Sequence, residues 1–167
     1  MADKIVYIAL GSNVGDRAAM LERAIVAMNS AGIRVLRQSS FYVTQPFHAP
    51  GQAWFLNAVV EAETSLLPLQ LLHALLRIER ELGRRRITPH GPRTIDLDIL
   101  LFGDVIVNDL ELTIPHPAMQ YRRFALEPLV EIAPDAVHPV LKKTVRELLI
   151  ELAPGQSVRR IESNANG

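Results

Sequence analysis

The sequence predicts an α/β domain of the α+β kind, with strands and helices in the order β-α-β-β-α-β. Two observations lead to this prediction. Short β-branched and aromatic runs alternate with two longer segments of helical periodicity, and stretches rich in Gly or Pro separate them. The chain of 167 residues, with 49% apolar and 22% charged side chains, suits one folded domain. We therefore expect a single domain over residues 1–167.

The first half of the order is a strand, a helix and a second strand. Ile5–Leu10 is an almost continuous apolar run that stops at Gly11, as a buried strand does before a turn. From about Asp16 the apolar residues keep helical spacing, and Gly32 is placed to end that helix. Ile33–Tyr42 then has the composition of a second strand.

The second half repeats the pattern as strand, helix and strand. Trp54–Glu63 alternates in polarity as a strand does, and Pro68 opens a helix that Gly83 closes. Thr94–Phe102 is the last strand, and its predicted core face consists of Ile95, Leu97, Ile99 and Leu101. This order predicts a ferredoxin-like arrangement with a mainly antiparallel sheet.

The remaining residues are less regular. Gly103–Val107 predicts a short edge strand, and Phe124–Ile132 and Thr144–Leu152 predict two extra helices near the C-terminus. Residues 155–167 have the composition of a frayed tail.

Composition excludes several classes of protein. The 18 basic and 18 acidic side chains give a net charge of +0, which argues against a nucleic acid or an anionic membrane as partner. The absence of cysteine excludes disulfides, thiolate catalysis and the usual structural zinc sites. The apolar run Ile5–Leu10 is too short for an export signal, and no stretch is long enough for a membrane helix. We expect a cytoplasmic protein.

Two carboxylates on the last predicted strand form the main candidate site. Asp96 and Asp98 are two residues apart, so they project from one face with Cα atoms about 6.6 Å apart. Paired carboxylates suit Mg²⁺ when water and phosphate oxygens supply the other ligands, and the pair could hold two ions. The alternative is a solvated outer face of the strand, and spacing alone leaves both interpretations open.

A basic segment precedes these acids. Arg84, Arg85, Arg86 and Arg93 fall in a stretch without Asp or Glu. Guanidinium groups bind phosphate with two hydrogen bonds, although an isolated basic run is more often a solvated loop. Beside a carboxylate pair, cations and metal ions are complementary parts of a phosphoryl-transfer site.

Three further positions suit a flat, polar-edged ligand. Phe55 and Asn57 share a strand face, where an aromatic ring and an amide could bind a heterocycle; a buried structural amide is equally compatible with the pattern. Phe124 could supply a second ring or belong to the core.

His116, in the segment Ile-Pro-His-Pro, is undecided between a phosphate ligand and a structural turn.

The residues alone leave two classes of function open. One is a Mg²⁺-dependent transferase, although the phosphate loop of P-loop enzymes is absent. The other is a non-catalytic ferredoxin-like module that binds a small ligand or RNA. RNA binding would favour exposed aromatic residues and a basic face, and the sequence indicates neither.

The segment Gly91–Ile99, with sequence Gly-Pro-Arg-Thr-Ile-Asp-Leu-Asp-Ile, resembles a specific signature of the hydroxymethyl-dihydropterin pyrophosphokinase family of folate biosynthesis. The resemblance extends to Gly11-Ser12-Asn13, Phe55–Ala58 and Pro115-His116, and it covers about residues 7–139. It implies a ferredoxin-like fold and transfer of pyrophosphate from ATP to the hydroxymethyl group of a reduced pterin, with release of AMP. It also implies two Mg²⁺ ions, ATP as co-substrate and no further organic cofactor, and we expect a monomer.

The resemblance assigns roles to individual residues. It implies that Asp96 and Asp98 hold the two Mg²⁺ ions and act in catalysis with Arg84 and Arg93. The implied ATP contacts are Leu72, Glu79, Arg84, Arg86, Arg93, Ile99, Leu112, Thr113, His116 and Arg122. The implied pterin contacts are Thr44, Gln45, Phe47, Phe55, Asn57 and Phe124.

Some positions depart from the family pattern. Phe55 stands where a tyrosine is frequent, His90 where a tryptophan is frequent, and Glu111 where an arginine can meet phosphate. Leu76 and Pro117 also differ from the usual residues. A carboxylate facing the triphosphate would repel it, so we expect Glu111 to point outward.

Overall fold

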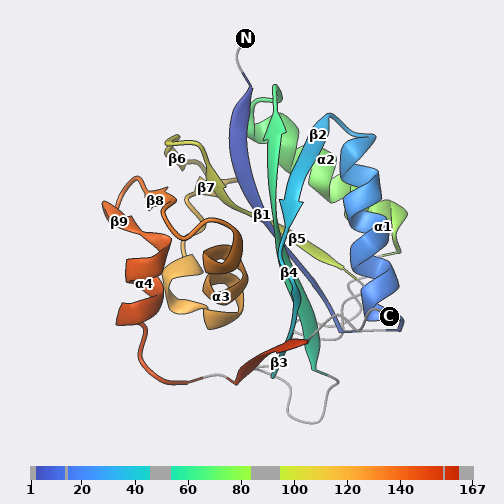
Figure 1. Ribbon diagram of the computed structural model, residues 1–167. Coiled ribbons are helices and arrows are strands. Elements are labelled where there is room, and N and C mark those ends of the chain that lie inside the picture. Colours follow the sequence, from blue (N-terminus) through green and yellow to red (C-terminus); the bar gives the residue numbers. More distant parts are fainter. Residues whose placement is uncertain (1–2, 14, 46–53, 84–94, 156, 162–167) are drawn as a thin grey trace.

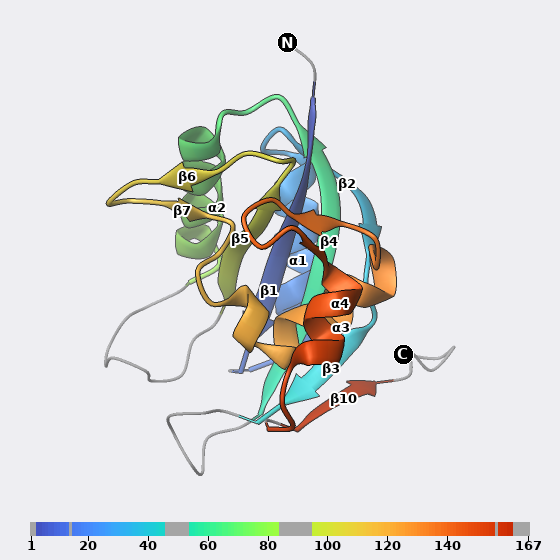
Figure 2. The same cartoon turned by 90° about the vertical axis from the view of Figure 1, so that its left-hand side faces the viewer.

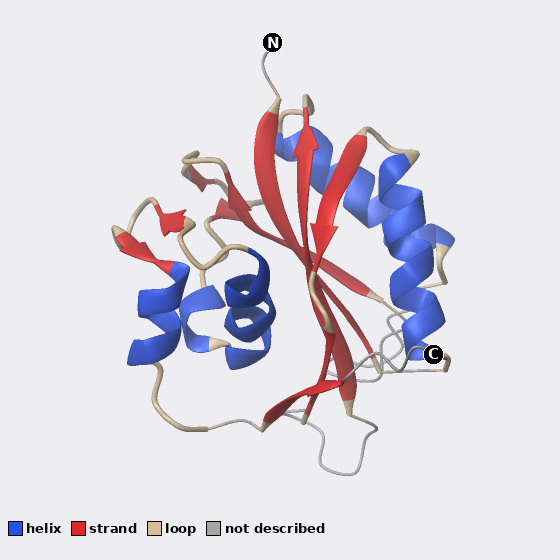
Figure 3. Cartoon of the chain, in the orientation of Figure 1, coloured by secondary structure: helices blue, strands red, loops and turns tan. Residues whose placement is uncertain are grey.

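The computed structural model describes residues 3–13, 15–45, 54–83, 95–155 and 157–161. A six-stranded antiparallel sheet divides the molecule, and helices cover both of its faces (Figures 1 and 3). The sheet order is β10-β3-β4-β1-β5, and β2 also pairs with β4. The strands are β1 (Lys4–Ser12), β2 (Ile33–Gln38), β3 (Phe41–Thr44), β4 (Phe55–Thr64), β5 (Asp96–Phe102) and β10 (Val158–Ile161). The predicted α/β class and the mainly antiparallel sheet are confirmed.

The predicted second strand, Ile33–Tyr42, is two strands that both pair with β4. The interruption falls at Ser39, whose N–H donates to the Val59 carbonyl at 2.9 Å. The Ser39 hydroxyl in turn accepts a hydrogen bond from the Val59 N–H at 2.9 Å. A side chain therefore replaces the backbone in the ladder at this point, and polarity alternation gives no sign of that exchange.

Helices α1 (Arg17–Asn29) and α2 (Pro68–Glu81) cover one face of the sheet (Figure 1). Asp16 caps α1 by accepting a hydrogen bond from the Ala19 N–H at 3.1 Å, and proline at the first position of α2 suits a helix start. Their apolar stripes pack on the sheet in a core that includes Leu21, Met28, Leu71, Leu75, Ile8 and Leu10. The two helices predicted from periodicity are confirmed.

The opposite face carries α3 (Arg123–Ile132) and α4 (Val145–Glu151), as the turned view also shows (Figure 2). Thr144 and Glu147 form a capping box at the start of α4. These helices enclose a second core with Val59, Leu101, Met119, Leu126 and Leu129. The two predicted C-terminal helices are present at nearly the expected residues.

Two short hairpins lie outside the main sheet. They are β6 (Val107–Asn108) with β7 (Thr113–Ile114), and β8 (Val137–His138) with β9 (Lys143–Thr144). The edge strand predicted over Gly103–Val107 is wrong, because Gly103 adopts a turn with φ of 54° and its N–H donates to the Ile5 carbonyl at 2.7 Å. Pairing begins only at Val107. Within the described residues, no helix is both long and apolar enough to span a membrane.

A bulge in β5 changes which face its last residues occupy. In the pairing with β1, Ile99 lies opposite Ile8 and Leu101 lies opposite Tyr7, so Leu100 is an extra residue. Leu100 and Leu101 therefore both join the α3 core, and Phe102 returns to the core under α1 and α2. The prediction that Leu101 shares a face with Leu97 is wrong for this reason.

The predicted frayed tail contains strand β10, which pairs with β3. Glu131 of α3 joins this edge to the helix layer. Its carboxylate accepts hydrogen bonds from the Ser40 N–H and hydroxyl and from the Tyr42 hydroxyl at 2.7 Å, and it lies 3.6 Å from Arg160 of β10. Partners far apart in sequence therefore order residues 158–161.

Candidate active site

One row of residues crosses the sheet on the face opposite α1 and α2. Backbone pairing places Asp96 of β5 opposite Gly11 of β1, and Gly11 opposite Asn57 of β4. Asp98 lies in the next row, opposite Ala9. With strands about 4.8 Å apart, the predicted metal ligand Asp96 and the predicted pterin ligand Asn57 are two strands, or roughly 10 Å, apart. Two bound molecules could therefore lie side by side on this face.

Gly11, the residue between these two positions, leaves room for the Asn57 amide. A Cβ atom at Gly11 would lie 2.8 Å from Asn57 Oδ1, closer than nonbonded contact permits. The missing side chain lets the Asn57 amide lie over the backbone of β1. Gly11 therefore forms a flat floor between the carboxylates and the amide.

The Asn57 amide is held in one orientation. Its Nδ2 donates a hydrogen bond to Thr44 Oγ1 at 2.7 Å, and both residues are buried. Phe55 lies on the same face of β4 and is half-buried. The structure thus brings together three predicted pterin contacts, while Gln45 follows β3 as an exposed residue.

Phe124 reaches this part of the molecule from a different element. It lies in the first turn of α3, the helix that packs on β4, and it is half-buried. The Arg122 guanidinium lies 5.5 Å from the centre of its ring, within the range of a cation–π contact. Among the predicted residues, Phe47, Arg84, Arg86 and Arg93 lie outside the described part of the chain.

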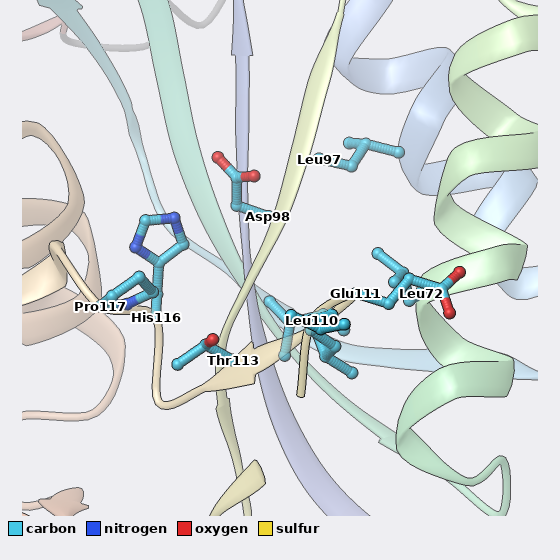
Figure 4. Close-up of a pocket in the computed structure, with 10 residues that line it drawn as sticks. Leu72, Leu97, Asp98, Leu110, Glu111, Thr113, His116 and Pro117 are labelled. Atoms are coloured by element: carbon cyan, nitrogen blue, oxygen red, sulfur yellow. The ribbon is translucent and has the colours of Figure 1, made fainter. Parts of the chain in front are cut away.

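A pocket of about 250 Å³ opens beside Asp98 (Figure 4). Asp98 and His116 stand next to each other on one wall, and apolar side chains from α2 and from the segment before β7 form the other (Figure 4). The predicted ATP contacts that line it are Leu72, Ile99, Leu112, Thr113 and His116. An apolar end and a carboxylate-bearing end in one cavity are compatible with a nucleotide.

The bulge in β5 positions His116. The carbonyl of the extra residue, Leu100, accepts a hydrogen bond from the His116 N–H at 3.0 Å. The Nδ1 atom of His116 accepts another from the Ala118 N–H at 3.1 Å, so a neutral ring carries its proton on Nε2. Burial lowers the pKa of His116 below its ordinary value, nearby Asp98 raises it, and Arg122 lowers it. Polarity patterns do not indicate this backbone contact, because a bulge leaves no mark in them.

Glu79, another predicted ATP contact, is not among the residues that line this pocket. It is 4% exposed, and its Oε2 accepts a hydrogen bond from the Leu97 N–H at 2.7 Å. Leu97 lies between Asp96 and Asp98. Apart from the family resemblance, helical spacing could have singled out Glu79, because it follows Leu75 by four residues and so falls on the apolar stripe of α2.

Glu111 lies at the rim of the pocket and is exposed. Its Oε1 is 3.0 Å from Nε2 of His73 on α2. This carboxylate therefore has a partner on α2. Figure 4 shows Glu111 beside Leu72, on the side of the pocket away from Asp98.

The carboxylates suit a hard metal ion that brings other ligands with it. Asp98 is exposed and Asp96 is half-buried, so both can be reached from solvent. Within the described ranges, no group of three or more His, Asp or Glu side chains could enclose a metal by itself. Mg²⁺ commonly binds through one or two carboxylates and takes water and phosphate oxygens as its remaining ligands. The donor set fits Mg²⁺ bound together with a nucleotide.

A comparison with protein families matches residues 7–134 to the model of 7,8-dihydro-6-hydroxymethylpterin-pyrophosphokinase, HPPK. The chain belongs to this family. The family that the motifs predicted is thereby confirmed.

Relatives match over most of the chain. A 2-amino-4-hydroxy-6-hydroxymethyldihydropteridine pyrophosphokinase of Methylorubrum extorquens is 45% identical over 93% of this chain and 98% of its own length. The folic acid synthesis protein fol1 of Schizosaccharomyces pombe is 41% identical over 98% of this chain, but the chain spans only 22% of that protein. The corresponding protein of Pneumocystis carinii is 47% identical over 83% of this chain, which spans 19% of it.

Solved structures share the fold. The wild-type HPPK-DHPS of Plasmodium falciparum, solved with pterin and p-hydroxybenzoate, superimposes with a TM-score of 0.72. The match covers 90% of this chain and 42% of that one, at 16% identity. This likeness supports the predicted fold class.

Proposed function

We propose that this chain transfers the terminal pyrophosphate of ATP to the hydroxymethyl group of 6-hydroxymethyl-7,8-dihydropterin, giving AMP and the pterin diphosphate for folate synthesis. The observation that carries the proposal is the row Asp96, Gly11, Asn57 across one sheet face. It offers a metal-binding end and a heterocycle-binding end on one sheet face, so two bound substrates could lie side by side. Family membership supports the same reaction.

In this proposal ATP occupies the pocket beside Asp98. Its base lies against the apolar wall formed by Leu72, Ile99 and Leu112, and its phosphates lie toward Asp98 and His116. The Nε2–H of neutral His116 donates a hydrogen bond to a phosphate oxygen. Arg84 and Arg93, predicted from the family motif, bind the transferred group.

Asp96 and Asp98 would hold two Mg²⁺ ions, which supply charge neutralisation at the phosphates and polarise the β-phosphorus for attack. Both carboxylates lie on one strand of the sheet, which favours a site organised before the substrates arrive. Neither carboxylate can serve as a ligand and as a general base at once.

The pterin would lie over the Gly11 floor. Thr44 orients the Asn57 amide so that Oδ1 and the second hydrogen of Nδ2 are available to the edge of the heterocycle. Phe55 from β4 and Phe124 from α3 would stack on its two faces.

The reaction then requires little covalent chemistry from the protein. The pterin hydroxyl oxygen forms a bond to the β-phosphorus, and the bond from that phosphorus to the α,β-bridging oxygen breaks to release AMP. The hydroxyl proton passes to solvent or to a phosphate oxygen. Positioning and electrostatic stabilisation supply most of the rate enhancement.

The number of Mg²⁺ ions is also part of this proposal. Two ions are supported by the two carboxylates, Asp96 and Asp98, which lie on adjacent rows of the sheet. The monomeric state and the cytoplasmic location stay predictions from the sequence.

Two substitutions test whether Asn57 binds the pterin and Asp98 binds the metal. Asn57→Ala should weaken pterin binding roughly tenfold or more and leave binding of ATP with Mg²⁺ unchanged, since the amide lies two strands from the carboxylates. Asp98→Asn should reduce turnover by orders of magnitude at saturating Mg²⁺ and leave pterin affinity unchanged. Calorimetry with each substrate alone, together with turnover assays, measures both effects. Pterin affinity unaltered in Asn57→Ala, or near-native turnover in Asp98→Asn, would refute the corresponding assignment.

A further inference from the structure

We propose that Glu79 is a positioning residue for the metal-binding carboxylates. In this inference its side chain holds the backbone of β5 at Leu97 and so fixes the relative placement of Asp96 and Asp98. The inference rests on the proposed function, because the placement of the two carboxylates matters only if they bind metal with the nucleotide.

The contact lies at the open edge of the sheet. β5 is the last strand in the sheet order and pairs with β1 along one side only, among the strands that the structure describes. The Leu97 N–H points to the other side, where a further strand would normally accept its hydrogen bond. Glu79 Oε2 accepts that bond at 2.7 Å and takes the place of the missing strand at this position.

The burial of Glu79 argues for a specific role. Glu79 is 4% exposed and belongs to the stripe of α2 that also buries Leu71, Leu75 and Ile78. Burying a carboxylate costs free energy, and an apolar residue of similar size is often neutral or stabilising at such a position. Packing energy therefore does not account for a glutamate here. Its hydrogen bond to the strand is an interaction that an apolar side chain cannot make.

The position of the bond links it to the site. Leu97 is the residue between Asp96 and Asp98, and its own side chain is buried in the core under α1 and α2. The backbone is thus held from three directions, by pairing with β1, by the Leu97 side chain and by Glu79. Groups that orient metal ligands in this way commonly alter metal affinity or activity by about 10-fold to 100-fold when they are removed.

Two variants separate the hydrogen bond from the charge. Glu79→Gln keeps the length and one acceptor oxygen, whereas Glu79→Met keeps approximate length and removes both the acceptor and the charge. Glu81→Gln, at an exposed glutamate of the same helix, is the matched control. We expect the control and Glu79→Gln to retain the Mg²⁺ requirement of the wild type. Glu79→Met should need about 10-fold to 100-fold more Mg²⁺ and keep its pterin affinity.

Two measurements that do not depend on turnover test the Mg²⁺ requirement and the hydrogen bond at Leu97. Calorimetry follows Mg²⁺-dependent binding of an ATP analogue with a methylene group between the α and β phosphates. Amide hydrogen exchange at Leu97 reports the bond itself, and we expect faster exchange in Glu79→Met and wild-type exchange in Glu79→Gln. If Glu79→Met does not fold, Glu79→Asp, which keeps the charge but falls short of Leu97, should show the same losses.

Three results would contradict the role proposed for Glu79. Equal losses in Glu79→Gln and Glu79→Met would overturn the inference, because the charge and not the hydrogen bond would then matter. Unchanged Mg²⁺ dependence in Glu79→Met would overturn it as well, with the proposed function intact. If the wild type itself binds the analogue without any dependence on Mg²⁺, the proposed function fails and the inference fails with it.

Discussion

At the scale of single residues, Gly11 sets how the two substrates can lie next to each other. A Cβ atom there would lie 2.8 Å from Asn57 Oδ1 and would push the amide out of its contact with Thr44. We expect Gly11→Ala to weaken pterin binding roughly tenfold or more, in line with the cost of overpacking a tight site. Calorimetric titration with pterin measures the change.

A matched control for Gly11→Ala is Gly155→Ala, where an added Cβ would meet nothing closer than the Ala153 carbonyl at 4.0 Å. That variant should bind pterin as the wild type does. If Gly11→Ala also binds normally, the close approach of β1 to Asn57 has no part in substrate recognition.

The sequence predicted some site residues and missed the role of others for physical reasons. The spacing of Asp96 and Asp98 indicated a shared strand face, and the pairing of β5 with β1 confirms it. The contact of Glu79 with the Leu97 N–H involves the backbone, which polarity patterns do not describe. The placement of His116 depends on a bulge at Leu100, and one inserted residue leaves no mark in composition.

At the scale of elements, the hairpin of β8 and β9 contains a pH-sensitive residue. His138 is 5% exposed, and its Nδ1 accepts hydrogen bonds from the N–H groups of Val140 and Leu141 at 3.3 and 3.1 Å. Burial lowers the pKa of His138 below its ordinary value of 6.5, although a backbone hydrogen bond partly opposes the shift. Protonation would abolish both acceptor contacts.

The sign of the effect on stability follows from proton binding. Between the lowered pKa and 6.5 the unfolded chain binds more protons at this residue than the folded chain does. His138 should therefore make the free energy of unfolding rise with pH through this window, with its contribution complete above 6.5 and lost as the pH falls. Denaturant unfolding at pH 5–8 measures the slope.

His138→Asn tests this dependence, because the Asn Oδ1 can accept in place of Nδ1 but does not titrate. The slope should become flatter in this variant and should persist in His73→Gln, which alters an exposed histidine. An identical slope in His138→Asn and the wild type would contradict the assignment.

Long-range contacts decided the elements that the sequence predicted incorrectly. The tail over residues 158–161 is a strand because β3 pairs with it and Arg160 lies near Glu131. The break within Ile33–Tyr42 arises from hydrogen bonds between Ser39 and Val59. In both cases the deciding partner is at least 20 residues away, beyond the reach of local patterns.

At the scale of the whole molecule, the two faces of the sheet differ in composition. Aliphatic side chains fill the face under α1 and α2. They come from strands in which apolar and polar residues alternate regularly, and this is why the core elements were predictable. The other face is partly covered by α3 and α4 and leaves Asp96, Asp98 and Asn57 in one region of the sheet surface. The fold therefore combines a rigid core with a site whose residues come from β1, β4 and β5.

The identity of the nucleotide product is the most direct test of pyrophosphate transfer by this site. Purified protein would be incubated with ATP, Mg²⁺ and 6-hydroxymethyl-7,8-dihydropterin, and the nucleotides would be separated by chromatography or followed by ³¹P NMR. We expect AMP, formed only when both the pterin and Mg²⁺ are present. ADP or free pyrophosphate as the product, or no turnover by correctly folded protein, would contradict it.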